Sequence, residues 1–85
     1  MNLNAQKRIE KKLDHIQLLY TGRGYHQVLK TSNKILKNHP NNFDALRLRG
    51  SSYYHLDNRD SAYFDLLKYS EHFKLDSSYF SIWLG

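Results

Sequence analysis

The stretch from Leu46 to Leu66 constrains the fold most, because it holds two apolar segments with helical spacing around a short polar break. The first segment places Leu46, Gly50 and Tyr53 four and three residues apart, and the second places Ala62 four residues before Leu66. Such spacings put side chains on one face of an α-helix. The break consists of Asp57, Asn58, Arg59 and Asp60. These residue types favour chain reversals, so the stretch predicts two helices joined by a tight turn.

Helical spacing recurs along the rest of the chain and predicts an all-α fold. We expect helices over about residues 4–21, 25–38 and 43–56, and a fourth helix that begins after Asp60 and ends near residue 75. Gly22 is expected to end the first helix in the left-handed cap conformation. Asn42 and Asp60 are expected to cap the third and fourth helices through their side chains. The two-residue alternation that is typical of a strand is missing from the sequence.

Gly50 lies inside the third predicted helix, where glycine is less favourable than alanine by about 1 kcal/mol. A glycine at such a position is compensated when a partner helix approaches its backbone closely. We expect the fourth helix to make this approach, with Ala62 as the small residue that faces Gly50. Replacement of Gly50 by leucine should therefore overpack the contact and destabilise the protein.

Gly50, Tyr53, Ala62 and Leu66 fall at the offsets of the tetratricopeptide repeat pattern. A weaker copy lies about 34 residues upstream, one repeat length, at Ile16, Leu19 and Val28, and Pro40-Asn41-Asn42 closes that unit. The stretch from Gly22 to Leu66 therefore resembles the tetratricopeptide repeat family. The resemblance implies antiparallel helix hairpins stacked as a short α-solenoid, and a function in noncovalent protein–protein recognition, as an adaptor or scaffold.

The sequence of 85 residues is expected to form a single helical domain of two degenerate repeats and a fragment. The repeat units cover about residues 9–42 and 43–76, and residues 77–85 are expected to form a partial or capping helix. Three readings of this apolar end remain open. It caps the preceding helix pair, it pairs two copies of the chain through Phe80, Ile82 and Trp83, or the chain is the N-terminal part of a longer protein.

The family resemblance also implies a concave groove that is lined by the first helix of each repeat and holds a peptide or a helix. The groove residues that it implies are Leu13, Gln17, Tyr20, Asp44, Arg47, Ser51, Tyr54 and His55. Tyr20 and Tyr54 would supply rigid contact area, and Arg47 would pair with a carboxylate of the ligand. The sequence does not identify the ligand.

No pattern in the sequence indicates catalysis, a cofactor or a metal site, so we expect a protein that is not an enzyme. The chain has no cysteine, and its five histidines lack the spacing of zinc ligands. Asp57, Asp60 and Asp65 do not match a calcium loop and are expected to lie in turns and on solvated faces. The absence of cysteine, of a secretory leader and of any long apolar stretch favours a soluble cytoplasmic protein.

Positive charge is concentrated in the first half of the chain. Residues 1–42 hold eight Lys or Arg against two acidic residues, net +6, whereas residues 43–85 hold five against six, net −1. The candidate basic surface consists of Lys11, Lys12, Lys34 and Lys37. These lysines are either solubilising side chains on exposed helix faces or an anion-binding surface, so a basic helical domain that binds nucleic acid is the alternative function.

Overall fold

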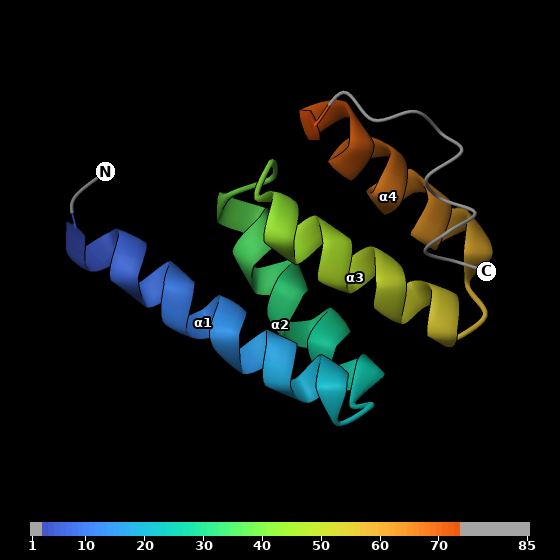
Figure 1. The fold of residues 1–85 in the computed structure, drawn as a ribbon, viewed down its shortest axis with the longest axis horizontal. Coiled ribbons are helices and arrows are strands. Elements are labelled where there is room, and N and C mark those ends of the chain that lie inside the picture. The colour runs from blue at the N-terminus through green and yellow to red at the C-terminus, as the bar shows by residue number, and fades with distance from the viewer. Residues whose placement is uncertain (1–2, 74–85) are drawn as a thin grey trace.

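The computed structural model describes residues 3–73, which form four α-helices joined by short turns (Figure 1). The helices are α1 (Leu3–Thr21), α2 (Tyr25–Asn38), α3 (Phe43–His55) and α4 (Arg59–Phe73). The predicted all-α fold is confirmed for these residues, and the predicted helices lie close to the observed ones. The predicted end of the fourth helix and the C-terminal segment with Phe80, Ile82 and Trp83 lie outside the described residues.

The third helix lies at the centre of the arrangement, since α3 packs against α1, α2 and α4. Successive helices run in opposite directions, so α1 and α2 form one hairpin and α3 and α4 another (Figure 1). The first and third helices are not consecutive, yet α1 and α3 lie side by side with α2 behind them (Figure 1). The stacking of the two hairpins as repeats of an α-solenoid remains a prediction, as does the division of the chain into repeat units.

The core is built from the apolar stripes of the helices, whose members recur at spacings of three and four residues. Its main cluster consists of Ile16, Val28, Ile35, Leu36, Ala45, Leu46 and Leu48. Ala62 and Leu66 of α4 are also fully buried. Leu13, Leu19, Tyr20 and Tyr69 pack around the cluster as half-buried side chains. This core fixes α1 against α3 and thereby positions the side chains that both helices present to solvent.

The turns after α1 and α3 have the same pattern of hydrogen bonds. In the turn after α1, the residue with the left-handed conformation is not the predicted Gly22. The amide of Gly24 donates to the Leu19 carbonyl at 2.8 Å, and that of Arg23 donates to the Tyr20 carbonyl at 3.0 Å. This pair of bonds defines a Schellman motif, whose left-handed residue is Arg23, with φ of 64°. The prediction for Gly22 was wrong because the bond register puts the left-handed position one residue later.

The turn between α3 and α4 repeats this geometry, with Asp57 as its left-handed residue at φ of 62°. The cap of α4 is Asn58, whose Oδ1 accepts a hydrogen bond from the Ser61 amide at 3.4 Å. The predicted cap, Asp60, instead lies in the first turn of α4, where a carboxylate favours the positive end of the helix dipole. The predicted cap of α3 is confirmed, since Asn42 Oδ1 accepts from the Ala45 amide at 3.0 Å.

Close packing of α4 on α3 at Gly50 is confirmed, although the partner residue differs from the predicted one. A β-carbon on Gly50 would lie 2.9 Å from Leu66 Cγ and 3.0 Å from Asp65 Cβ. Real β-carbons do not approach other atoms so closely. The nearest atoms of α4 belong to Asp65 and Leu66, about one turn beyond Ala62, which the sequence had suggested as the facing residue.

Among residues 3–73, no helix is both long enough and apolar enough to cross a membrane.

Candidate functional site

Predicted groove residues of α1 and α3 lie side by side, since Gln17 contacts Arg47 and Tyr20 contacts His55. The name α1/α3 surface is used here for Gln17, Tyr20, Asp44, Arg47, Ser51, Tyr54 and His55. Arg47 of α3 donates from Nη2 to Gln17 Oε1 of α1 at 3.3 Å. The same Nη2 lies 3.9 Å from Asp44 Oδ1, one turn earlier on α3. An amide, a guanidinium and a carboxylate thus meet at the junction of two helices, and the contact joins Gln17 to a residue thirty positions later in the sequence.

A cluster of aromatic rings occupies the end of the α1/α3 surface where α1 ends and α3 ends. Tyr20 Oη lies 3.2 Å from His55 Nε2, within hydrogen-bond distance. The His55 ring stacks on Tyr25, with centroids 4.6 Å apart and planes inclined by 5°. Tyr54 meets His55 edge to face at 5.9 Å. Three predicted groove residues, Tyr20, Tyr54 and His55, therefore belong to one cluster.

Two members of this aromatic end were not predicted from the sequence. Tyr25 is the first residue of α2, and the reversal at residues 22–24 folds it back against Tyr20 and His55. The short turn between two helical patterns was the signal that could have found it. Arg59 lies over the Tyr54 ring at 5.7 Å and adds a cation at the same end.

The predicted groove residues differ in how much of each side chain is exposed to a ligand. Gln17 and His55 are exposed, whereas Asp44, Arg47, Ser51 and Tyr54 are half-buried. Leu13 is half-buried and packs against the core. It also helps to line a hollow formed with Gln6, Ile9, Glu10 and Asn42. The α1/α3 surface therefore continues from the aromatic end toward the N-terminal half of α1.

The side chains of the α1/α3 surface can make several kinds of noncovalent contact. They include a guanidinium, an amide, phenols and an imidazole, which can donate or accept hydrogen bonds with a peptide backbone or side chain. These groups bond one another in the free protein, so a ligand must replace contacts that are already made. Surfaces of this composition, with aromatic and arginine side chains among neutral polar groups, are typical of protein interfaces.

The four lysines of the candidate basic surface are all exposed, Lys11 and Lys12 on α1 and Lys34 and Lys37 on α2. In the part of the chain that the structure describes, the ion pairs found all involve arginine, so these lysines have no acidic partner there. They are available to an anion, as solubilising lysines on any helix would be.

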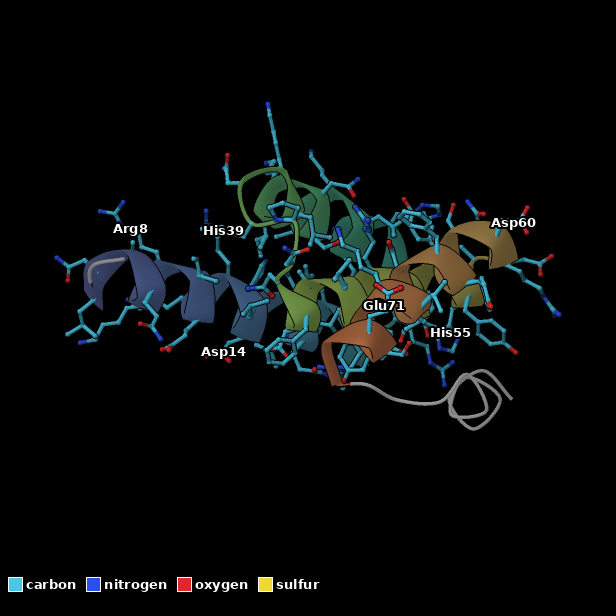
Figure 2. All side chains as sticks on the ribbon, turned by 90° about the horizontal axis from the view of Figure 1, so that it is seen from above. Arg8, Asp14, His39, His55, Asp60 and Glu71 are labelled. Carbon is cyan, nitrogen blue, oxygen red and sulfur yellow. The ribbon has the colours of Figure 1, made fainter. Side chains whose placement is uncertain are left out.

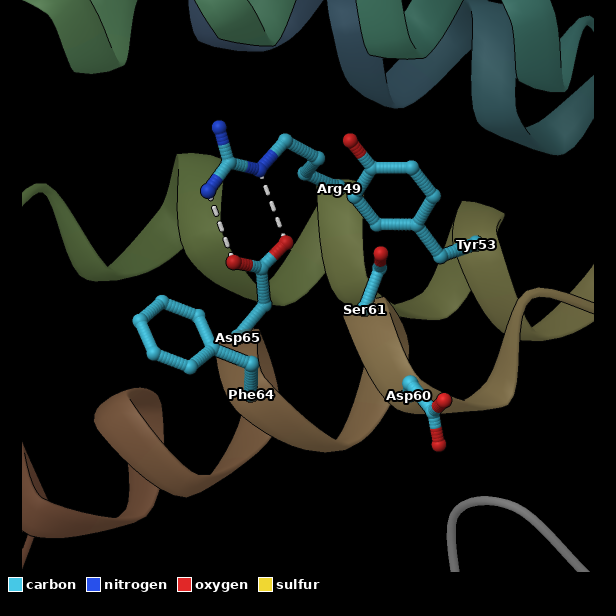
Figure 3. A pocket seen from close by; sticks show the side chains of 6 residues that line it. All are labelled: Arg49, Tyr53, Asp60, Ser61, Phe64 and Asp65. Carbon is cyan, nitrogen blue, oxygen red and sulfur yellow. Dashed lines mark hydrogen bonds and ion pairs between the residues drawn. The ribbon is translucent and has the colours of Figure 1, made fainter.

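A second cluster contradicts the prediction for Asp65, which was expected on a solvated face. Its side chain is only 1% exposed and forms a two-pronged ion pair with Arg49, whose Nε and Nη2 each lie 2.7 Å from a carboxylate oxygen (Figure 3). Arg49 also donates from Nη1 to Asn33 Oδ1 at 2.9 Å. The hydrogen bond to Asp65 raises the pKa of Arg49, against the effect of burial, and the carboxylate charge adds to the rise.

The signal for a buried Asp65 was present in the sequence. Asp65 follows Ala62 by three residues and precedes Tyr69 by four, which is the spacing of the inward face of α4. A carboxylate on that face requires a cation from the helix opposite, and Arg49 is the cation that α3 presents there. The prediction placed Asp65 in solvent because it is acidic, whereas its position on the inward face of α4 causes its burial.

Histidine and acidic side chains do not gather into a metal site within residues 3–73, where no group of three such residues lies together. His39 and His55, for example, lie at well-separated places along the molecule (Figure 2). Comparison of the sequence and the structure with protein-family models, curated proteins and solved structures gives no match. The assignment to the tetratricopeptide repeat family therefore remains a prediction.

Proposed function

We propose that this protein is a noncovalent protein-recognition module, an adaptor or scaffold, that binds a peptide or a helix along the α1/α3 surface. The observation that carries the proposal is the contact of predicted groove residues across two helices. Arg47 reaches Gln17 at 3.3 Å, and His55 reaches Tyr20 at 3.2 Å. Side chains that were selected only for their place in a repeat pattern thus share one surface.

The ligand that suits this surface has mixed polar and apolar character. Arg47 is held between Gln17 and Asp44, so a ligand carboxylate can exchange with a weak, half-exposed ion pair at little cost. The rings of Tyr20, Tyr25 and Tyr54 offer rigid contact area, which loses little conformational entropy when a partner binds. Catalysis is not part of the proposal.

Affinity capture from an extract of the source cells tests the proposal, with and without nuclease. The test variant is Arg47→Ala with Tyr54→Ala, which removes one cation and one ring from the α1/α3 surface. The control variant is Arg8→Ala with Tyr63→Ala, which removes the same two residue types from exposed positions on α1 and α4. We expect a protein that survives nuclease, is captured by the control variant, and is lost from the test variant.

Nucleic acid is the alternative outcome of this experiment. The proposal would be contradicted if the captured material disappears with nuclease and is captured equally by the wild type and the test variant. Nucleic-acid binding would then be assigned to the basic residues. Salt gives a second criterion, because phosphate contacts weaken steeply between 50 and 200 mM salt through release of counterions. Binding through the aromatic end should change little over that range.

A further inference from the structure

A second hollow surface lies where α2, α3 and α4 meet, called here the α2/α4 groove. It is lined by Asn33, Leu36, Lys37, Pro40, Leu46, Arg49, Phe64 and Lys68. A neighbouring hollow shares Arg49 and Phe64 and extends past Tyr53 and Ser61 (Figure 3). Arg49 follows Arg47 by two residues, or about 200° around the helix, so the groove opens on the side of α3 opposite the α1/α3 surface.

The Arg49–Asp65 pair at the floor of this groove holds a guanidinium in one orientation. A buried ion pair is weak evidence for stability, since well-packed apolar side chains of similar volume often do as well. A guanidinium has five N–H donors, and Arg49 uses three of them on Asp65 and Asn33. Two donors remain on a side chain that is 20% exposed. The pair therefore presents a fixed donor to the groove, which lowers the entropy cost of binding an acceptor there.

The rest of the groove combines positive charge with apolar surface. Lys37 of α2 and Lys68 of α4 line it from opposite walls, and neither has an acidic partner among residues 3–73. Phe64 is 66% exposed and adds apolar surface beside these charges. The Asp65 carboxylate is already paired with Arg49, and Asp60 points away from that guanidinium (Figure 3). The charge left for a ligand in this hollow is positive.

We propose that the α2/α4 groove docks an acidic peptide segment in which carboxylates flank an apolar side chain. The carboxylates would pair with Lys37 and Lys68 and accept from Arg49, while the apolar side chain covers Phe64. Among the described residues that line this groove, Phe64 is the one aromatic side chain, and it lies with the aliphatic side chains of Leu36, Pro40 and Leu46. This lining suits an apolar peptide side chain better than the successive bases of a nucleic acid, which stack on several aromatic rings. This docking surface is separate from the α1/α3 surface, and either proposal can fail alone.

Selection from a phage-displayed library of random dodecapeptides on the immobilised full chain tests the proposal. We expect the enriched peptides to share Asp or Glu next to Phe, Leu, Ile or Trp. Fluorescence anisotropy with the most enriched peptide should then show at least tenfold weaker binding to a Lys37→Glu, Lys68→Glu variant. The matched control, Lys7→Glu with Lys30→Glu, changes the net charge equally at exposed positions of α1 and α2 and should bind within twofold of the wild type. Circular dichroism verifies that both variants remain helical.

A Phe64→Ala variant separates the apolar contact from the charges, and we expect it to weaken the same peptide by at least fivefold. The proposal is overturned if selection enriches no acidic motif, or if both lysine variants bind the peptide equally. It is also overturned if Arg47→Ala with Tyr54→Ala abolishes binding, which would move the peptide to the α1/α3 surface. A competition experiment uses an oligothymidine of twenty nucleotides. The groove would be assigned to nucleic acid instead if this oligonucleotide displaces the peptide and its binding depends on Lys37 and Lys68.

Discussion

At the residue scale, the Arg49–Asp65 pair joins α3 to α4 through two hydrogen bonds of 2.7 Å. Asp65→Ala should destabilise the protein by about 3 kcal/mol, because it leaves a half-buried guanidinium without its partner. The exposed ion pair between Arg59 and Asp57 is the control. Asp57→Asn removes the charge but keeps a side chain that tolerates the left-handed conformation of this residue, and it should change the free energy of unfolding by less than about 0.5 kcal/mol. Urea unfolding followed by circular dichroism measures both. Equal midpoints for the two variants would show that the buried pair has no special role.

Arg23 is the residue where a substitution should stabilise the protein. Its φ of 64° places a β-carbon in the left-handed region, which costs about 1 kcal/mol or more for a residue other than glycine. Arg23→Gly should therefore raise the free energy of unfolding by about 0.5 kcal/mol after the extra entropy of the unfolded glycine is subtracted. Lys30→Gly is the comparison, because Lys30 lies inside α2, where glycine is unfavourable. This substitution should lower the free energy of unfolding by about 1 kcal/mol. Loss of stability in Arg23→Gly would contradict the assigned turn.

At the scale of elements, the packing of α4 on α3 depends on the missing side chain of Gly50. Gly50→Ala improves helix propensity by about 1 kcal/mol, yet its β-carbon would lie 2.9 Å from Leu66 Cγ. We expect overpacking to prevail and the protein to lose about 1–2 kcal/mol of stability, with a larger loss for Gly50→Leu. Thermal unfolding measures the change against Ser51→Ala, one residue along the same helix. A higher melting temperature for Gly50→Ala would show that the helices separate easily.

The helices could be predicted because their signals are local. Apolar spacing identified each one, and the Asn42 cap and the reversal around Pro40 fixed the start of α3. The details that failed depend on the hydrogen-bond register or on packing at a distance. The register moved the left-handed position from Gly22 to Arg23, and the crossing of α3 and α4 put Leu66 rather than Ala62 against Gly50.

The candidate site was predictable only in part, because some of its contacts depend on packing between residues that are distant in the sequence. Repeat offsets selected Gln17 and Arg47, which the structure places in contact, because both face the junction of their helices. Tyr25 was missed because it comes from α2, outside the helices that the offsets select. Asp65 was missed because a carboxylate was expected in solvent despite its spacing on the inward face of α4. The Arg49 side chain that permits its burial lies sixteen residues earlier on another helix.

At the scale of the whole molecule, the central α3 presents different chemistry to its two sides. Toward α1 it contributes Arg47, Tyr54 and His55 to a polar and aromatic surface, whereas toward α2 and α4 it contributes Arg49 to a positive groove. The small core of the described residues holds these faces in a fixed relation. Under the two proposals, one module would hold a protein partner on one side of α3 and an acidic peptide segment on the other.

Site-specific photocrosslinking in an extract of the source cells tests the central claim, that the α1/α3 surface recognises protein, most directly. The photoreactive residue p-benzoylphenylalanine replaces Tyr54 on that surface or, as the control, Leu18, which is 72% exposed on α1. We predict a crosslinked protein at position 54 that resists nuclease and is absent at position 18. Equal crosslinking at both positions, or nuclease-sensitive products alone at position 54, would contradict the claim.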